Sequence, residues 1–253
     1  MGLLNCVVRY EVTESLTVDV PLYRPENWWD PEEVRAYESS LVDALCAAAG
    51  AKPGPLRLVD CGAEIGLFSV LMAARLPQIA HVIAIEPDPA AIEILETNIA
   101  RLPIPGEARL AAVGETPGRG RLEHPETDDS AHAQFIVTDA NGPTEILRID
   151  DLGLPRDGTL LLKLDVEGAE LAVLEGARQT LSEVADFVVA IEAHSQVAAR
   201  TGGDPIECLR LLESIRPCQF SIAERPEVAL STERGFFDQM KEGIYNVVCV
   251  ARG

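Results

Sequence analysis

Residues 59–66 read VDCGAEIG, and they join a short apolar run to an apolar segment of helical character. A glycine at position 62 lets the backbone turn tightly and approach a ligand, while Gly66 lets the following helix pack closely on the strand. Asp60 stands where dinucleotide-binding proteins carry the first glycine of their phosphate-binding turn. This strand–turn–helix unit predicts a Rossmann-like α/β domain that binds its ligand at the carboxyl ends of parallel strands.

The chain around this turn alternates short strands with helices. The strands are apolar on both faces, which predicts a mostly parallel sheet covered by helices on two sides. The predicted strands are 56–60, 81–86, 109–113, 145–149, 159–165, 186–192, 218–223 and 245–251, and the helices between them are 66–76, 90–102, 168–178 and 204–215. Residues 114–143 are rich in Gly, Pro, Asp and Thr and predict an irregular insertion.

Residues 1–54 precede this pattern and predict a pair of short strands followed by one helix. Asp30 is the expected N-cap of that helix, with proline at the first helical position, and Gly50 is expected to end it. A length of 253 residues fits a single large α/β domain. We therefore expect 1–54 to be part of the same domain as the ligand-binding region 55–253.

The formal net charge of −20 limits the partners of the protein. So acidic a surface repels nucleic-acid phosphates and anionic lipid head groups, so we expect neither a nucleic-acid nor a membrane partner. The six cysteines lack metal-ligand spacing, the N-terminus lacks signal-peptide features, and no apolar run approaches the ~18 residues that span a bilayer. These features predict a cytoplasmic protein with reduced thiols, and a homodimer is a candidate assembly.

Acidic residues at the turn distinguish between candidate cofactors. Glu86 lies at the end of the second strand, at the distance from the turn where an acidic side chain accepts the ribose hydroxyls of a nucleotide. Asp60 and Glu64 would repel a pyrophosphate but suit the ammonium and sulfonium groups of S-adenosylmethionine. The sequence thus favours S-adenosylmethionine over NAD. An NAD-dependent oxidoreductase and a non-catalytic binding protein of the same fold remain the alternatives.

A second motif, KLDVEGAE at 163–170, runs from a strand into a helix. Asp165 could contact the amino group of the cofactor, orient the hydroxyl group of the substrate, act as a general base, or only cap the following helix. Lys163 lies two residues earlier on the same strand face, where we expect it to form an ion pair with Asp165.

Three segments resemble the FkbM family of methyltransferases: VDCGAEIGLFS at 59–69, AIEPDPAAIEILETNI at 84–99 and LLKLDVEGAELAVLEGA at 161–177. Glu64 departs from the family, which usually has Asn there. The resemblance implies a seven-stranded sheet of order 3-2-1-4-5-7-6 with the last strand antiparallel. It also implies methyl transfer to a hydroxyl of a small molecule such as a sugar, a polyketide or another secondary metabolite.

The resemblance, together with the turn, assigns candidate site residues. The expected cofactor-binding residues are Asp60, Gly62, Ala63, Glu64, Gly66, Glu86, Pro87, Ala112 and Asp165. For catalysis we expect Asp165, Glu192 and His194.

The expected catalytic residues each leave alternatives open. His194 follows a core strand and could accept the hydroxyl proton, although a loop histidine without a catalytic role fits equally well. Glu192 and Asp165 form a candidate Mg²⁺ site. His132, in the insertion, could reach the substrate, and Trp28 and Trp29 could stack on the cofactor or pack the N-terminal segment.

Overall fold

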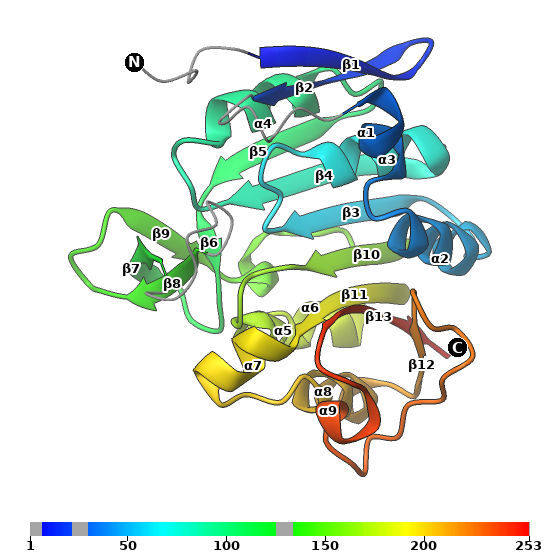
Figure 1. The fold of residues 1–253 in the computed structure, drawn as a ribbon, viewed down its shortest axis with the longest axis vertical. Helices are drawn as coiled ribbons and strands as arrows, with labels where there is room; N and C mark the ends of the chain where they lie inside the picture. Colours follow the sequence, from blue (N-terminus) through cyan, green and yellow to red (C-terminus); the bar gives the residue numbers. More distant parts are fainter. Residues whose placement is uncertain (1–6, 22–29, 125–133, 253) are drawn as a thin grey trace.

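The computed structural model describes residues 7–21, 30–124 and 134–252. Most of these residues form one central sheet with helices on both faces, and a smaller sheet lies beside it (Figure 1). Trp28, Trp29 and His132 lie outside the described residues, so their predicted roles stay untested.

The central sheet has seven strands. In spatial order they are β12 (Cys218–Ile222), β13 (Ile244–Ala251), β11 (Asp186–His194), β10 (Thr159–Leu164), β3 (Leu56–Cys61), β4 (Ile79–Glu86) and β5 (Gly106–Leu110). Strand β13 runs antiparallel to both of its neighbours, and the other pairings are parallel. Numbered along the chain within this sheet, the order is 3-2-1-4-5-7-6, which confirms the predicted topology.

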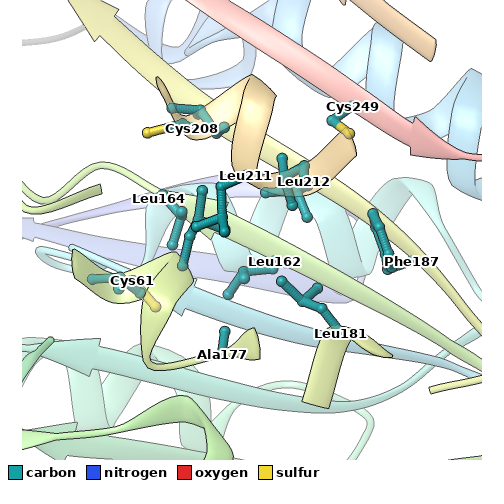
Figure 2. Packing of buried hydrophobic residues seen from close by; sticks show 14 of the residues in the cluster. Cys61, Leu162, Leu164, Ala177, Leu181, Phe187, Cys208, Leu211, Leu212 and Cys249 are labelled. Carbon is teal, nitrogen blue, oxygen red and sulfur yellow. The ribbon is translucent and has the colours of Figure 1, made fainter. Parts of the chain in front are cut away.

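Alternate side chains of each strand enter two separate hydrophobic clusters. On β10, Leu162 and Leu164 face one cluster, whereas Leu161 faces the other. The first cluster is covered by α5 (Glu170–Glu175), α6 (Arg178–Glu183) and α8 (Ile206–Ile215), and the second by α2 (Ser39–Gly50), α3 (Leu67–Arg75) and α4 (Ile92–Ala100). Figure 2 shows the first cluster, in which helix leucines meet the strand side chains. Both faces are apolar because both are buried, as the sequence predicts.

The N-terminal hairpin belongs to the second cluster. Its strands are β1 (Val7–Thr13) and β2 (Leu16–Pro21). Asn98 of α4 is fully buried and ties this hairpin to the turn after β3: its amide nitrogen donates to the carbonyls of Asp19 (2.9 Å) and Ile65 (2.8 Å). Its amide oxygen accepts from the N–H of Asp19 at 2.8 Å. The carboxylate of Asp19 pairs with Arg9 and Arg101, both at 2.8 Å.

The prediction that residues 114–143 are irregular is wrong. They contribute β7 (Gly118–Glu123) and β8 (Phe135–Thr138) to a four-stranded sheet with β6 (Ala112–Val113) and β9 (Thr144–Leu147), in the order β6-β9-β7-β8. Gly120 makes this packing possible, since a Cβ there would lie 2.7 Å from the carbonyl oxygen of Val137. The glycines that suggested a loop instead permit close strand pairing.

The third strand of the central sheet also differs from its prediction. It covers β5 rather than 109–113, because β5 is an edge strand whose side chains are half-exposed, whereas the apolar residues from position 111 cross into the small sheet. Figure 1 shows the small sheet beside the carboxyl ends of the central strands. The insertion therefore lies next to the region where the fold binds ligands.

Two predicted helices are interrupted. The helix over 168–178 is split at Gly176, where a Cβ would collide with the carbonyl oxygen of Gly114. The N-terminal helix is split into α1 (Pro31–Ala36) and α2 at Glu38, which has left-handed backbone angles of φ 46° and ψ 34°. Asp30 caps α1 in a capping box with Glu33, as predicted.

The remaining helical segments are short: α7 (Ser195–Thr201), α9 (Phe236–Gln239) and the 3₁₀ turn η2 (Ile149–Asp151). Among the described residues, no helix combines the length and the apolar character needed to cross a membrane.

We predict that Asn98→Ala lowers the free energy of unfolding by about 2–4 kcal/mol, because it leaves buried backbone groups of Asp19 and Ile65 without partners. Glu96→Ala, on an exposed position of the same helix, is the matched control and should change it by less than about 0.5 kcal/mol. Urea unfolding monitored by circular dichroism measures both. Equal effects of the two substitutions would show that Asn98 does not hold the hairpin.

Candidate functional site

A cavity of about 720 Å³ opens at the carboxyl ends of β3, β4, β10 and β11. Its remaining walls come from Tyr37 between α1 and α2, from Leu122 and Ile136 of the small sheet, and from α7. The predicted site residues that line it are Gly62, Ala63, Glu64, Glu86, Pro87, Ala112, Asp165, Glu192 and His194. One cavity thus collects side chains that are more than 100 residues apart in the sequence.

The turn after β3 is held against the end of β10. Gly62 has φ 78°, and a Cβ at this position would collide with the carbonyl oxygen of Asp165. The Asp165 N–H donates to the carbonyl of Cys61 at 3.1 Å, and the Gly62 N–H donates to that of Ile85 at 3.0 Å. Only glycine satisfies both the left-handed angle and this contact.

Glu86 closes the same turn from the end of β4. Its carboxylate accepts the backbone N–H of Glu64 at 2.8 Å and that of Asp88 at 2.9 Å. Burial raises the pKa of Glu86 to about 7, although these two N–H donors act to lower it. The carboxylate therefore shapes the turn while it faces the cavity.

Asp60 and Gly66, also predicted to bind the cofactor, do not line the cavity, and their part in cofactor binding stays a prediction. Asp60 is fully buried and accepts the Ser69 hydroxyl at 2.7 Å. Gly66 begins α3 at φ 79°, where a Cβ would lie 2.8 Å from Leu95 of α4. Both residues stabilise the turn on the side away from the cavity: Asp60 through its bond to Ser69 of α3, and Gly66 through its close packing on α4.

Lys163 is the buried cation of the site, and its predicted ion pair with Asp165 is confirmed. Its ammonium donates to Asp165 Oδ2 at 2.9 Å, lies 4.0 Å from Asp60 and sits 5.2 Å from the centre of the Phe68 ring. Burial lowers the pKa of Lys163, but the charges of Asp165, Glu38 and Asp60 outweigh it and hold the pKa above its ordinary value. Lys163 therefore stays protonated.

The sequence reasoning missed Tyr37 and Glu38, which reach the site through the break between α1 and α2. Tyr37 lines the cavity, and its interaction with Glu38 acts to lower the pKa of that carboxyl. The pair Ser39–Ser40, directly after Glu38, is a helix-start signal that could have indicated the second helix.

Glu192 lies near the end of β11 at the far side of the cavity. Burial, followed by the negative charge of Asp165, raises the pKa of Glu192 to about 9. Its carboxyl group therefore keeps its proton at neutral pH and can donate a hydrogen bond into the cavity.

His194 caps α7 instead of standing free in a loop. Its Nδ1 accepts the N–H groups of Gln196 (3.1 Å) and Val197 (3.3 Å). Because Nδ1 is an acceptor, the neutral ring carries its proton on Nε2. A proton acceptor would need the opposite arrangement, so this geometry does not support His194 as the general base.

The small sheet and α7 meet at Arg200, a second feature that sequence reasoning missed. The guanidinium of Arg200 lies 4.8 Å from the centre of the Phe135 ring and donates to the carbonyl of Glu167 at 2.9 Å and to its carboxylate at 3.3 Å. The apolar run FIVT at 135–138 could have indicated a strand within the insertion.

The expected Mg²⁺ is not supported. Across the described ranges 7–21, 30–124 and 134–252, no group of three or more His, Cys, Asp or Glu side chains could hold a metal ion. Glu192 holds its proton and Asp165 is paired with Lys163, which leaves this pair poorly suited to a divalent cation.

A known protein family matches the part of the chain that contains the predicted site residues. The family described as "Methyltransferase FkbM domain" matches residues 60–222, which include every predicted site residue. Methyltransferase sdnD of Sordaria araneosa is 31% identical over 173 residues, which cover 52% of this chain and 64% of that protein.

Two solved structures are similar to this chain over most of its length. Methyltransferase FkbM from Methylobacillus flagellatus KT has 20% identity and a TM-score of 0.47, with 89% of this chain and 56% of that chain covered. M. jannaschii TYW2 in complex with AdoMet has 13% identity and a TM-score of 0.46, with 97% and 84% covered. The chain spans less than two thirds of the length of sdnD and of the M. flagellatus protein.

We predict that Glu192→Gln makes the protein more stable at alkaline pH. The raised pKa of Glu192 means that the unfolded chain releases this proton above about pH 4.5 while the folded protein retains it, so the wild type loses stability as the pH rises toward about 9. Glutamine removes that loss. The gain in unfolding free energy should be near zero at about pH 4 and exceed about 1 kcal/mol at about pH 8.

Denaturant titrations at the two pH values measure this difference. Glu242→Gln, on an exposed position, is the control and should show no such dependence on pH. A gain for Glu192→Gln that is equal at both pH values would contradict the raised pKa.

Proposed function

This chain belongs to the FkbM family of methyltransferases, and from that premise we propose that it transfers the methyl group of S-adenosylmethionine to a hydroxyl oxygen of a small molecule. The observation that carries the proposal is the glycine turn of residues 62–66 facing a cavity whose wall carries Glu86, Asp165 and Lys163.

The residues at this turn fit the cofactor. Gly62 lines the cavity without a side chain, so a ligand can approach its backbone. Glu86 offers a carboxylate at the position suited to the ribose hydroxyls of the cofactor. Pro87 and Ala112 provide apolar walls for its adenine ring. A volume of about 720 Å³ falls within the range of cofactor pockets. When bound, the cofactor would supply a methyl group on a positively charged sulfur, activated for transfer to an acceptor oxygen with the sulfur as the leaving group.

The alternative of an NAD-dependent oxidoreductase fits less well. Glu64, Glu86 and Asp88 line the cavity around the turn, and their carboxylates would repel a pyrophosphate. The family match to methyltransferases argues against it independently.

The chain's own residues then orient the acceptor. Asp165 is the carboxylate at the cavity wall whose Oδ2 is fixed by Lys163, so an acceptor hydroxyl can donate to the same carboxylate and point its oxygen toward the methyl group. As the new carbon–oxygen bond forms, the hydroxyl proton passes to Asp165 or to water. Glu192, which keeps its proton, acts as a donor to a second oxygen of the acceptor.

The charges of the cavity support an acceptor without phosphate groups. Among the described residues that line the cavity, the Lys and Arg side chains are those of Lys163 and Arg200, which are paired with Asp165 and Glu167. An anionic acceptor would therefore meet an excess of carboxylates. Small hydroxylated compounds such as unphosphorylated sugars and polyketides satisfy this condition, whereas nucleic acids do not.

Two measurements test the proposal. Calorimetric titration should detect binding of S-adenosylhomocysteine. Incubation with cofactor labelled with ¹³C in the methyl group, against a panel of hydroxylated compounds, should yield a product whose methyl carbon has the NMR shift of an O-methyl group. Absence of S-adenosylhomocysteine binding would contradict the cofactor assignment, and an N- or C-methyl product would contradict the acceptor assignment.

A further inference from the structure

Three carboxylates surround one ammonium group beneath the wall of the cavity. Lys163 contacts Asp165 at 2.9 Å and lies 4.0 Å from Asp60. Glu38, at the break between α1 and α2, is close enough for its charge to act on Lys163 as well. Lys163 and Asp165 of this group line the cavity, as does Tyr37, the neighbour of Glu38.

Two carboxylate oxygens of this group have no hydrogen-bond donor among the residues that the structure describes. They are Oε2 of Glu38 and Oδ1 of Asp60, and both atoms are buried. Buried polar atoms without partners are rare in folded proteins, and two around a single lysine indicate a deficit of positive charge at this place.

The backbone holds Glu38 in this position by an uncommon conformation. Its left-handed angles are disfavoured for residues other than glycine, so the surrounding structure must impose them. The neighbouring Tyr37 interacts with the Glu38 carboxyl and acts to lower its pKa. The sequence could have relieved this strain with glycine at position 38, yet it carries a carboxylate there.

We propose that Glu38 is a specificity-determining residue: with Asp60 and Asp165 it leaves the cluster around Lys163 short of positive charge, so that the cavity favours a positively charged nucleoside over its uncharged counterpart. The inference rests on the proposed function, in which a sulfonium cofactor becomes a neutral thioether product. Glu38 does not line the cavity, so its negative charge acts electrostatically on the lining residues Tyr37, Lys163 and Asp165. The arrangement strengthens binding of the substrate form of the cofactor relative to the spent form, which limits inhibition by product.

The ionisation of Glu38 agrees with this role. Burial raises the pKa of Glu38, the ammonium of Lys163 lowers it, and Asp165 and Asp60 raise it further. A positively charged occupant of the adjoining cavity opposes the negative charges of Asp165 and Asp60 and stabilises the ionised form of Glu38. By linkage, ionised Glu38 stabilises the bound cation by the same factor.

The experiment compares the affinities of S-adenosylmethionine and S-adenosylhomocysteine, which differ by the methyl group and its charge. Calorimetry at about pH 8, where the carboxylate is more fully ionised, gives both dissociation constants for the wild type and for Glu38→Gln. Glutamine keeps the size and polarity of the side chain and removes its charge. We expect the preference for S-adenosylmethionine over S-adenosylhomocysteine to fall at least about fivefold.

Two further variants separate charge from structure. Glu38→Gly adopts the left-handed angles without strain and should show the same loss of preference. Glu32→Gln removes an equal charge from an exposed position of α1 and should leave the preference unchanged. If both ligands bind and the Glu38 variants keep the wild-type preference, the inference is overturned while the proposed function stands. If neither ligand binds the wild type, both fail.

Discussion

Lys163 of β10 lies directly opposite Asp60 of β3 in the parallel pairing of the two central strands. A buried ammonium is stable only beside carboxylates, and here Asp60 lies on the neighbouring strand and Asp165 directly follows its own strand. This ion cluster fixes the strand ends relative to each other. Because Asp165 is held there, its carbonyl oxygen lies against Gly62 and sets the turn that faces the cavity.

Other buried acids at the same end of the sheet have shifted pKa values. Burial of carboxylates raises the pKa of Glu86 and Glu192, so this end of the sheet contains acids that titrate near or above neutral pH. Such groups can act as donors or as binding partners for cations in ways that exposed carboxylates cannot. The fold of the family thus provides the glycine turn at 62–66, and the surrounding acidic residues determine whether the cavity prefers a charged or an uncharged ligand.

Sequence reasoning succeeded where the local pattern and the physical requirement coincide. Gly62 is needed for a left-handed turn in close contact with Asp165, and Glu86 ends a buried strand at a fixed distance from that turn, so spacing alone identified both. Spacing does not reveal contacts that depend on the tertiary structure. The burial of Asp60 behind Lys163, and the N–H groups that occupy His194 Nδ1, cannot be read from spacing. Likewise, the small sheet was not predicted, because its glycines, which permit close strand pairing, are also typical of loops. Glu38 reaches the site only because the helix breaks between α1 and α2.

The central claim is that the ion cluster around Lys163 organises the site, and a double-mutant cycle of unfolding free energies between Lys163 and Asp60 tests it most directly. Lys163→Met leaves buried carboxylates uncompensated and should cost about 3–5 kcal/mol. Adding Asp60→Asn to that variant should restore more than about 1 kcal/mol, because it removes one of the uncompensated charges. A Lys163→Met protein as stable as the wild type, or two effects that simply add, would contradict the account.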